Sequence, residues 1–224
     1  YNASGEVSAM WLDGLGAPAC ADYSASGWGT GFAVSQYHVV TSAHVLYCCK
    51  TVIVHDLESC RSNAATIVTT EQRSDLGLLR LDKPVKHHAT LRRGKELQLG
   101  EEVSTYDRRP VVDSCPRYVV GQGKVTELNW MPDDSRLMVH DAPTRAGSSG
   151  GPVLDASAHI VGVSTLGGVP ESTTRSDAVK SYLLEGFLKT NSIEYNTAPS
   201  IEKLSRSEIK EKSDKFTLIV RCMR

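Results

Sequence analysis

Three residues of the chain have the types and surroundings that acyl transfer needs. Ser149 lies in the run GSSGGP, His44 follows the β-branched run HVVT and the small residues SA, and Asp75 directly precedes the apolar run LGLL. Acyl transfer by serine requires a hydroxyl nucleophile, a general base in contact with it and a carboxylate that orients the base. The chain contains these groups in the order histidine, aspartate, serine.

This order argues against a second arrangement that the serine motif would allow. GSSGG also fits G-x-S-x-G, the nucleophile turn of α/β-hydrolases, in which an aspartate and then a histidine follow the serine. His159 is the only histidine after Ser149, ten residues on, with Asp155 as the only acid between them. Neither that spacing nor the strand-rich chain described below suits an α/β-hydrolase.

Each of the three groups also has a non-catalytic interpretation. Glycine and serine cluster in ordinary turns, so GSSGGP alone is compatible with a flexible loop. His44 alone is compatible with a core histidine, and Asp56 and Asp82 are rivals of Asp75 as turn or orienting residues. We interpret the remaining histidines as surface or structural residues: His38, His55, His87, His88, His140 and His159.

Ten short runs between residues 27 and 165 have the composition of β-strands. They are rich in Val, Ile, Thr and Tyr, and Gly, Pro, Asp and Asn separate them. Strands without intervening helical patterns favour antiparallel barrels or sandwiches over a parallel sheet. A polar, basic run at 87–102 is expected to link two barrels. The runs are GFAVS, HVVTSA, TVIVHD, ATIVTT, LGLLRL, EVSTYD, YVVGQGKVTEL, RLMVHD, PVLD and HIVGVST.

After residue 175 the pattern changes. Apolar residues at 179, 182, 183, 184 and 187 form a helical stripe within 176–190. Ser205 and Glu208 form a capping-box pattern that predicts the start of a second helix, and the strand-like run FTLIVRC follows it.

The composition is that of an ordinary globular protein. The chain has 224 residues, 40% of them hydrophobic and 23% charged, and a formal net charge of −1. Neither a nucleic-acid partner nor an anionic membrane partner is predicted from this charge. No apolar run reaches the eighteen or so residues that span a bilayer, so no membrane span is expected.

The cysteines predict an oxidising compartment with at least one disulfide. They number six: Cys20, Cys48, Cys49, Cys60, Cys115 and Cys222. We expect the excursion between Cys49 and Cys60 to fold back as a hairpin and Cys60 to bridge to Cys48 or Cys49. A zinc site of these three cysteines with His55 fits no common ligand spacing, so neither a metal nor a cofactor is predicted.

Three segments together resemble the signature regions of trypsin-like (chymotrypsin-fold) serine peptidases, and HtrA-type (DegP-like) bacterial peptidases most of all. They are GTGFAVSQYHVVTSAHVL, SDLGLLRL and HDAPTRAGSSGGPVLDASAHIVGVS. The resemblance covers roughly residues 27–190. It implies an all-β fold of two antiparallel six-stranded barrels, a C-terminal helix and a short helix–strand tail. It also implies an extracytoplasmic enzyme, periplasmic or secreted, from a bacterium.

The resemblance implies a role for each candidate residue. Ser149 would be the nucleophile, His44 the general base and then acid, and Asp75 the orienting carboxylate. The backbone amides of Gly147 and Ser149 would form the oxyanion hole, where a glycine allows dihedral angles that other residues avoid. The substrates would be proteins or peptides, cleaved through an acyl-enzyme intermediate.

The resemblance also implies which residues line the specificity pocket. Pro143 stands six residues before the nucleophile, where a carboxylate would select a basic side chain, and we therefore expect small or medium apolar side chains at the position cleaved. The backbone of Thr165, Leu166 and Gly167 would pair with an extended substrate, and their side chains would line the entrance. Arg175 and Asp177 would both face the pocket, where either the two neutralise each other or Arg175 selects acidic residues.

We expect three units: an N-terminal barrel at 1–98, a C-terminal barrel with its helix at 99–191, and a tail at 192–224. The tail is expected as a helix and a strand packed on a barrel, with Cys222 tethering it through a disulfide. It is too short for the PDZ domain of typical HtrA proteins, so a PDZ-gated trimer is not expected. The alternative function is a binding or chaperone-like module on a peptidase fold with little or no hydrolysis.

Overall fold

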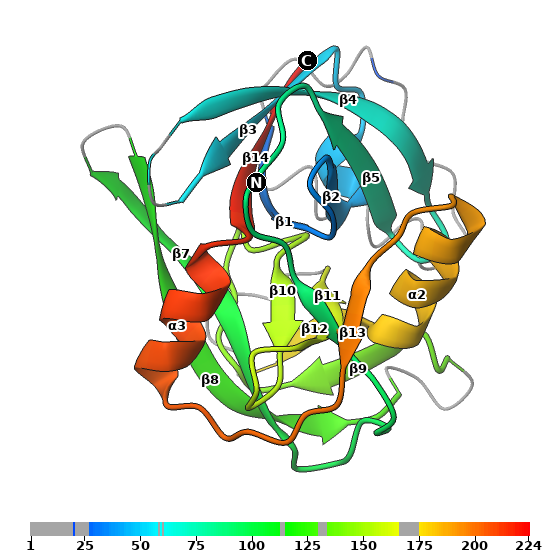
Figure 1. Cartoon of the computed structure of the whole chain (residues 1–224), viewed down its shortest axis with the longest axis vertical. Helices are drawn as coiled ribbons and strands as arrows, with labels where there is room; N and C mark the ends of the chain where they lie inside the picture. The colour runs from blue at the N-terminus through cyan, green and yellow to red at the C-terminus, as the bar shows by residue number, and fades with distance from the viewer. Residues whose placement is uncertain are drawn as a thin grey trace.

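Two β-barrels stacked one above the other make up the core of the molecule (Figure 1). The computed structural model describes residue 20 and residues 27–57, 59, 61–112, 115–129, 134–165 and 175–224. Two antiparallel barrels were predicted from the sequence, and this prediction is confirmed. No helix within the described ranges has the length and apolar content to cross a membrane.

The first barrel closes through a strand from the far end of the chain. Its strands follow one another around the barrel in the order β1-β14-β3-β4-β5-β2, so β14 separates β1 from β3. In Figure 1, β14 runs in red through the otherwise blue and cyan barrel. The strands are β1 (Gly27–Ala33), β2 (His38–Ser42), β3 (Thr51–Asp56), β4 (Ser62–Glu71), β5 (Leu76–Leu81) and β14 (Thr217–Met223).

Strand β14 pairs antiparallel on both sides, with β1 over residues 217–222 and with β3 over residues 218–223. Its register sets Cys222 opposite Gly27 of β1 and opposite Val52 of β3. Alternate side chains serve two different cores, as the two-residue period of a strand dictates. Leu218 and Val220 lie in the cluster inside this barrel, whereas Ile219 lies in the large cluster that also includes residues of the second barrel.

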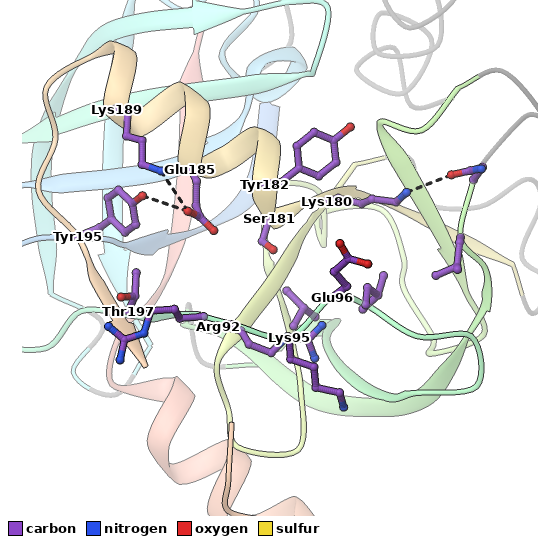
Figure 2. Close-up of a pocket in the computed structure, with 16 residues that line it drawn as sticks. Arg92, Lys95, Glu96, Lys180, Ser181, Tyr182, Glu185, Lys189, Tyr195 and Thr197 are labelled. Carbon is purple, nitrogen blue, oxygen red and sulfur yellow. Dashed lines mark hydrogen bonds and ion pairs between the residues drawn. The ribbon is translucent and has the colours of Figure 1, made fainter. Parts of the chain in front are cut away.

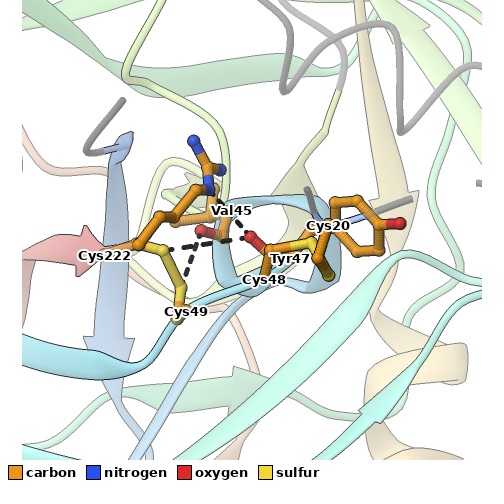
Figure 3. Close-up of a disulfide and its surroundings, with 7 residues drawn as sticks. Cys20, Val45, Tyr47, Cys48, Cys49 and Cys222 are labelled. Atoms are coloured by element: carbon orange, nitrogen blue, oxygen red, sulfur yellow. Dashed lines mark hydrogen bonds between the residues drawn. A yellow bond between two sulfur atoms is a disulfide. The ribbon is translucent and has the colours of Figure 1, made fainter. Parts of the chain in front are cut away.

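Two disulfides join neighbouring cysteines to distant parts of the chain (Figure 3). Cys49 bonds to Cys222 on β14, as expected for a tether of the tail, and Cys48 bonds to Cys20. The predicted bridge from Cys60 to Cys48 or Cys49 is therefore wrong. The hairpin of β3 and β4 does form, but the pairing of β14 with β3 brings Cys222 to Cys49. Cys60 itself lies outside the described residues.

The second barrel belongs to a larger sheet. Its strands run in the order β10-β7-β8-β9-β12-β11, and a pairing of β10 with β11 closes the circle. Two short strands, β6 and β13, extend the sheet beyond β11 with parallel pairing. The strands are β6 (Thr90–Arg92), β7 (Glu102–Val112), β8 (Cys115–Glu127), β9 (Leu137–His140), β10 (Pro152–Leu154), β11 (Ile160–Ser164), β12 (Ser176–Lys180) and β13 (Asn196–Ala198).

Helices α2 (Ser181–Thr190) and α3 (Arg206–Asp214) flank the barrels (Figure 1). The predicted capping box of α3 is confirmed: Ser205 accepts the Glu208 amide hydrogen, and the Glu208 carboxylate accepts the Ser205 amide hydrogen. Helix α3 is fixed to the second barrel by Tyr106 of β7, whose hydroxyl lies 2.6 Å from that of Ser213.

Two boundaries differ from the sequence expectation. The helical stripe was expected within 176–190, but Ser176–Lys180 forms strand β12, because this segment pairs with both β9 and β11. The expected linker at 87–102 contains strand β6, which pairs with β11 and β13. Pairing with strands that are distant in the sequence determines the secondary structure of both segments, and local sequence patterns do not indicate this pairing.

The two-sided burial of β14 predicts a large cost for shortening one of its side chains. Ile219→Ala should lower the free energy of unfolding by about 2–5 kcal/mol, since Ile219 is fully buried. Ile67→Ala makes the same change on β4, where the side chain is 38% exposed, and should cost less than about 1 kcal/mol. Urea unfolding of both variants with the disulfides intact measures the difference. Equal destabilisation of the two variants would contradict the two-sided burial of β14.

Candidate active site

Strand pairing brings His44 and Asp75 together. Strands β2 and β5 are antiparallel with Ser42 opposite Leu76, so the residues just after β2 lie beside the residue just before β5. His44 sits there in the short 3-10 helix η2 (Ala43–Leu46). The amide of Ala43 donates to the carbonyl of Asp75 at 3.0 Å and fixes the two segments at backbone level.

The carboxylate of Asp75 is fully buried and accepts several hydrogen bonds. The backbone amide of His44 donates to Oδ1 at 2.9 Å, and His44 Nδ1 lies 2.7 Å from Oδ2. The hydroxyl of Thr165 also donates to Oδ2. Burial raises the pKa of Asp75, but the His44 ring and these hydrogen bonds outweigh burial and hold the pKa below its usual value.

The contact with Asp75 determines which ring nitrogen of His44 is left free to accept a proton. An ionised carboxylate only accepts hydrogen bonds, so Nδ1 of the neutral ring is the protonated nitrogen. Nε2 then has a free lone pair and can accept a proton. The ring is 1% exposed, so its orientation is fixed by packing as well as by the carboxylate.

Strands of both barrels hold the loop that bears Ser149. Thr30 of β1 donates its amide to the Ser149 carbonyl at 2.8 Å and its hydroxyl to the Gly147 carbonyl at 2.7 Å. From the second barrel, the carbonyl of Ser164 accepts the Gly150 amide at 2.6 Å. The serine loop is therefore fixed between the two barrels, on the side where His44 lies.

Gly147 and Ser149 leave their amide hydrogens unused within the described part of the chain, although amides close by in the same loop are bonded. Gly147 has φ +96°, a conformation that glycine adopts without the clash of a Cβ atom. A free amide at each of these two positions is what an oxyanion hole requires.

The hydroxyl of Ser149 points to Thr165 and not to His44. Its Oγ donates to the Thr165 carbonyl at 2.9 Å, and the described residues include no hydrogen bond between Ser149 and His44. Thr165 thus touches both partners, through its carbonyl to Ser149 and through its hydroxyl to Asp75. The Thr165 side chain was expected at the pocket entrance, but it is buried against Asp75.

The other residues predicted to line the pocket have the following surroundings. Pro143 is exposed, and its carbonyl accepts the Thr105 hydroxyl at 2.9 Å. Arg175 Nη1 binds Glu127 at 2.8 Å, while its Nε lies 3.8 Å from Oδ1 of Asp177. Burial raises the pKa of Asp177 to about 6 against the pull of Arg175. Leu166 and Gly167 lie outside the described residues.

A model of the trypsin-like peptidase domain matches residues 29–163, which include His44, Asp75 and Ser149. The chain belongs to the trypsin-like peptidase domain family.

Sequence and structure comparisons place HtrA-type members of this family among its relatives. An uncharacterised protein of Sinorhizobium fredii, y4bJ, is 30% identical over 89% of this chain and 33% of its own length. Serine protease HTRA1A of Danio rerio is 28% identical over 71% of this chain and 34% of its own length. The chain thus spans about one third of the length of these relatives.

Among solved structures, the fold resembles a serine endoprotease from Yersinia pestis with a TM-score of 0.62. The two chains are 20% identical, over 72% of this chain and 56% of that one. This similarity supports the two-barrel architecture of a trypsin-like peptidase domain independently of the family match.

The bond from Thr165 to Asp75 predicts an effect on acid stability. Thr165→Val keeps the shape and removes the donor, which should raise the pKa of Asp75 and lower the free energy of unfolding at pH 7 by about 1–3 kcal/mol. Because the pKa of Asp75 is lowered on folding, its contribution to stability is present above the unfolded pKa and disappears as the pH falls through the folded pKa. The deficit of the variant should therefore shrink towards low pH.

Thr165→Ser is the matched control, because it keeps the hydroxyl and should unfold with nearly the same pH dependence as the parent protein. Denaturant unfolding measured from pH 2 to pH 8 compares the three proteins. A deficit of Thr165→Val that stays constant with pH would show a packing effect without a bond to the ionised carboxylate.

Proposed function

We propose that the protein is a serine endopeptidase with Ser149 as nucleophile, His44 as general base and Asp75 as orienting carboxylate. The observation that supports this most is the contact of Asp75 with His44 Nδ1 at 2.7 Å, because it leaves Nε2 as the base in a chain of the trypsin-like peptidase family. The unused amides of Gly147 and Ser149 support a place for the oxyanion in the same loop.

The reaction begins when the Ser149 hydroxyl turns from the Thr165 carbonyl towards His44. Nε2 takes the hydroxyl proton while Oγ bonds to the carbonyl carbon of the substrate, and the carbonyl oxygen becomes an oxyanion held by the two amides. His44 then gives its proton to the leaving amine, and the peptide bond breaks to leave an acyl-enzyme. Water, activated by His44 in the same way, releases the acid and restores Ser149.

We also propose protein or peptide substrates and an extracytoplasmic location. The two disulfides support an oxidising compartment, such as a periplasm or the outside of a cell, because thiols stay reduced in most cytosols.

Neighbouring serines allow a matched test of the nucleophile. Ser149→Ala should lower peptide hydrolysis by roughly 10⁴-fold or more and abolish labelling by a fluorophosphonate, because it removes the attacking oxygen. Ser148→Ala removes a hydroxyl that accepts the Arg145 amide at 3.2 Å and should keep both activities within about tenfold. Thermal unfolding checks that both variants are folded.

A folded protein without activity would favour the binding module. A folded parent protein that neither hydrolyses casein or peptide libraries nor reacts with the fluorophosphonate would overturn the peptidase proposal.

For the residue before the cleaved bond, we propose a preference for small or medium apolar side chains. Pro143 gives the pocket an apolar wall, and Glu127 engages the Arg175 guanidinium that would otherwise attract acidic side chains. Asp177 is the acid that could oppose this preference, since its Oδ1 is buried without a hydrogen-bond partner among the described residues. Arg175 lies beside Asp177, and burial disfavours the charged form of the Asp177 carboxyl group.

A peptide library varied at this position should show faster cleavage after Ala, Val, Thr or Leu than after Arg, Lys, Asp or Glu. Asp177→Asn should leave this order unchanged, as should Asp82→Asn, an exposed control. Asp177 ionises as the pH rises through about 6. A preference for Arg or Lys that appears above this pH and is lost in Asp177→Asn would contradict the proposal and assign Asp177 as the basic-specificity residue.

A further inference from the structure

A second cavity, of about 850 Å³, lies beside helix α2 (Figure 2). Strand β6, the segment that follows it, the end of β12 and the start of α2 contribute its walls. His44, Asp75 and Ser149 are not among its lining residues, so it is separate from the catalytic groups. Its volume is within the range that small-molecule sites occupy in proteins.

The lining of this cavity combines apolar and basic side chains. Leu97, Leu128, Val161, Tyr182 and Tyr195 supply apolar surface. Five of the lining residues are basic and two are acidic: Arg92, Arg93, Lys95, Lys180 and Lys189, with Glu96 and Glu185. A ligand that matches such a wall needs both an apolar body and a negative charge.

Three of the basic side chains are already neutralised. Arg92 is buried and pairs with Glu101, with Asp155 at 3.7 Å. Lys95 also reaches Glu101, at 3.4 Å. On the other side of the cavity, Lys189 reaches Glu185 at 3.4 Å (Figure 2).

Arg93 and Lys180 have no carboxylate partner within the described part of the chain. Lys180 Nζ donates to the amide oxygen of Asn129 at 3.2 Å, which uses one of its three hydrogens (Figure 2). Partial burial lowers the pKa of Lys180 against the attraction of Asp134, so its ammonium is incompletely solvated. An anion at Lys180 would replace the water that this ammonium has lost.

The acidic residues of the lining do not supply that anion. Glu185 is engaged by Lys189 and by the Tyr195 hydroxyl at 3.3 Å. Glu96 makes no ion pair in the described ranges, and it is not among the charges that shift the pKa of Lys180. The two basic groups therefore outnumber the single unpaired acid.

We propose that this cavity binds a small organic acid whose carboxylate pairs with Lys180 and whose apolar body packs on Leu97, Val161 and Tyr182, with Arg93 adding positive charge to the same cavity. The same chemistry is found in a free aryl or alkyl acid and in the C-terminal residue of a peptide with an apolar side chain. The binding is independent of peptide hydrolysis.

The probe is 4-phenylbutyrate, compared with its neutral analogue 4-phenylbutanol. Titration of the ¹⁵N-labelled protein should shift amide signals of Leu97, Val161 and Tyr182 saturably with the acid, and at least fivefold more weakly with the alcohol. N-acetyl-Leu-Phe, which ends in a free carboxylate, is titrated in parallel. The tighter of the two acids identifies the natural source, and either order supports the site.

Lys180→Gln and Arg93→Gln should each weaken 4-phenylbutyrate binding by about fivefold to tenfold, because the first removes a charge-assisted contact and the second lowers the positive charge of the cavity. Lys86→Gln, an exposed residue outside the cavity, should leave it unchanged. Arg93 is exposed, so its variant stays informative even if Lys180→Gln disturbs β12. Absence of saturable binding, equal binding of the alcohol, unchanged affinity in both variants, or shifts centred on Ser149 would each overturn the proposal.

Discussion

The site depends on keeping one buried negative charge bonded. Asp75 is fully buried, and burial alone would drive its carboxyl group towards the neutral form. Hydrogen bonds from His44 and Thr165 reverse this tendency. Because His44 belongs to the first barrel and Thr165 follows a strand of the second, the charge also fixes how the two barrels meet. The backbone of Asp75 is held at φ +50°, a conformation that aspartate tolerates better than most residues.

The first barrel supplies the rigidity that this arrangement needs. Strand β2 leads directly into the helix that bears His44, and the disulfide from Cys49 to Cys222 fixes the chain shortly after it. His44 is thus held between a strand on one side and a covalent bond to β14 on the other. The second disulfide, from Cys48 to Cys20, adds a further attachment at the same point (Figure 3).

Local patterns were enough to predict much of this molecule. Each of the ten strand-like runs overlaps a strand, and the capping box of Ser205 marks the start of α3. The contact of His44 with Asp75 is the one that the order and setting of these residues suggested. Such features depend on short stretches of sequence, or on a resemblance that three short motifs carry together.

What the sequence did not reveal depends on long-range pairing. Nothing in the run FTLIVRC indicates that it inserts between β1 and β3, yet this insertion brings Cys222 to Cys49, one of the two cysteines expected to bond to Cys60. Ser176–Lys180 carries a helix-like stripe but pairs with two strands. The hydroxyl of Thr165 could have been suspected only from its position at the end of an apolar strand near the serine loop.

The position of β14 has a consequence for synthesis of the chain. As it leaves the ribosome, the first barrel has only the strands β1 to β5, and its sheet ends in two unpaired edges, at β1 and at β3. The strands of the second barrel emerge next, and the missing strand, Thr217–Met223, emerges after them. Pairing across so long a stretch of sequence is slow, because the loop that it closes is large. The half of the protein that is made first is therefore the half that is completed last.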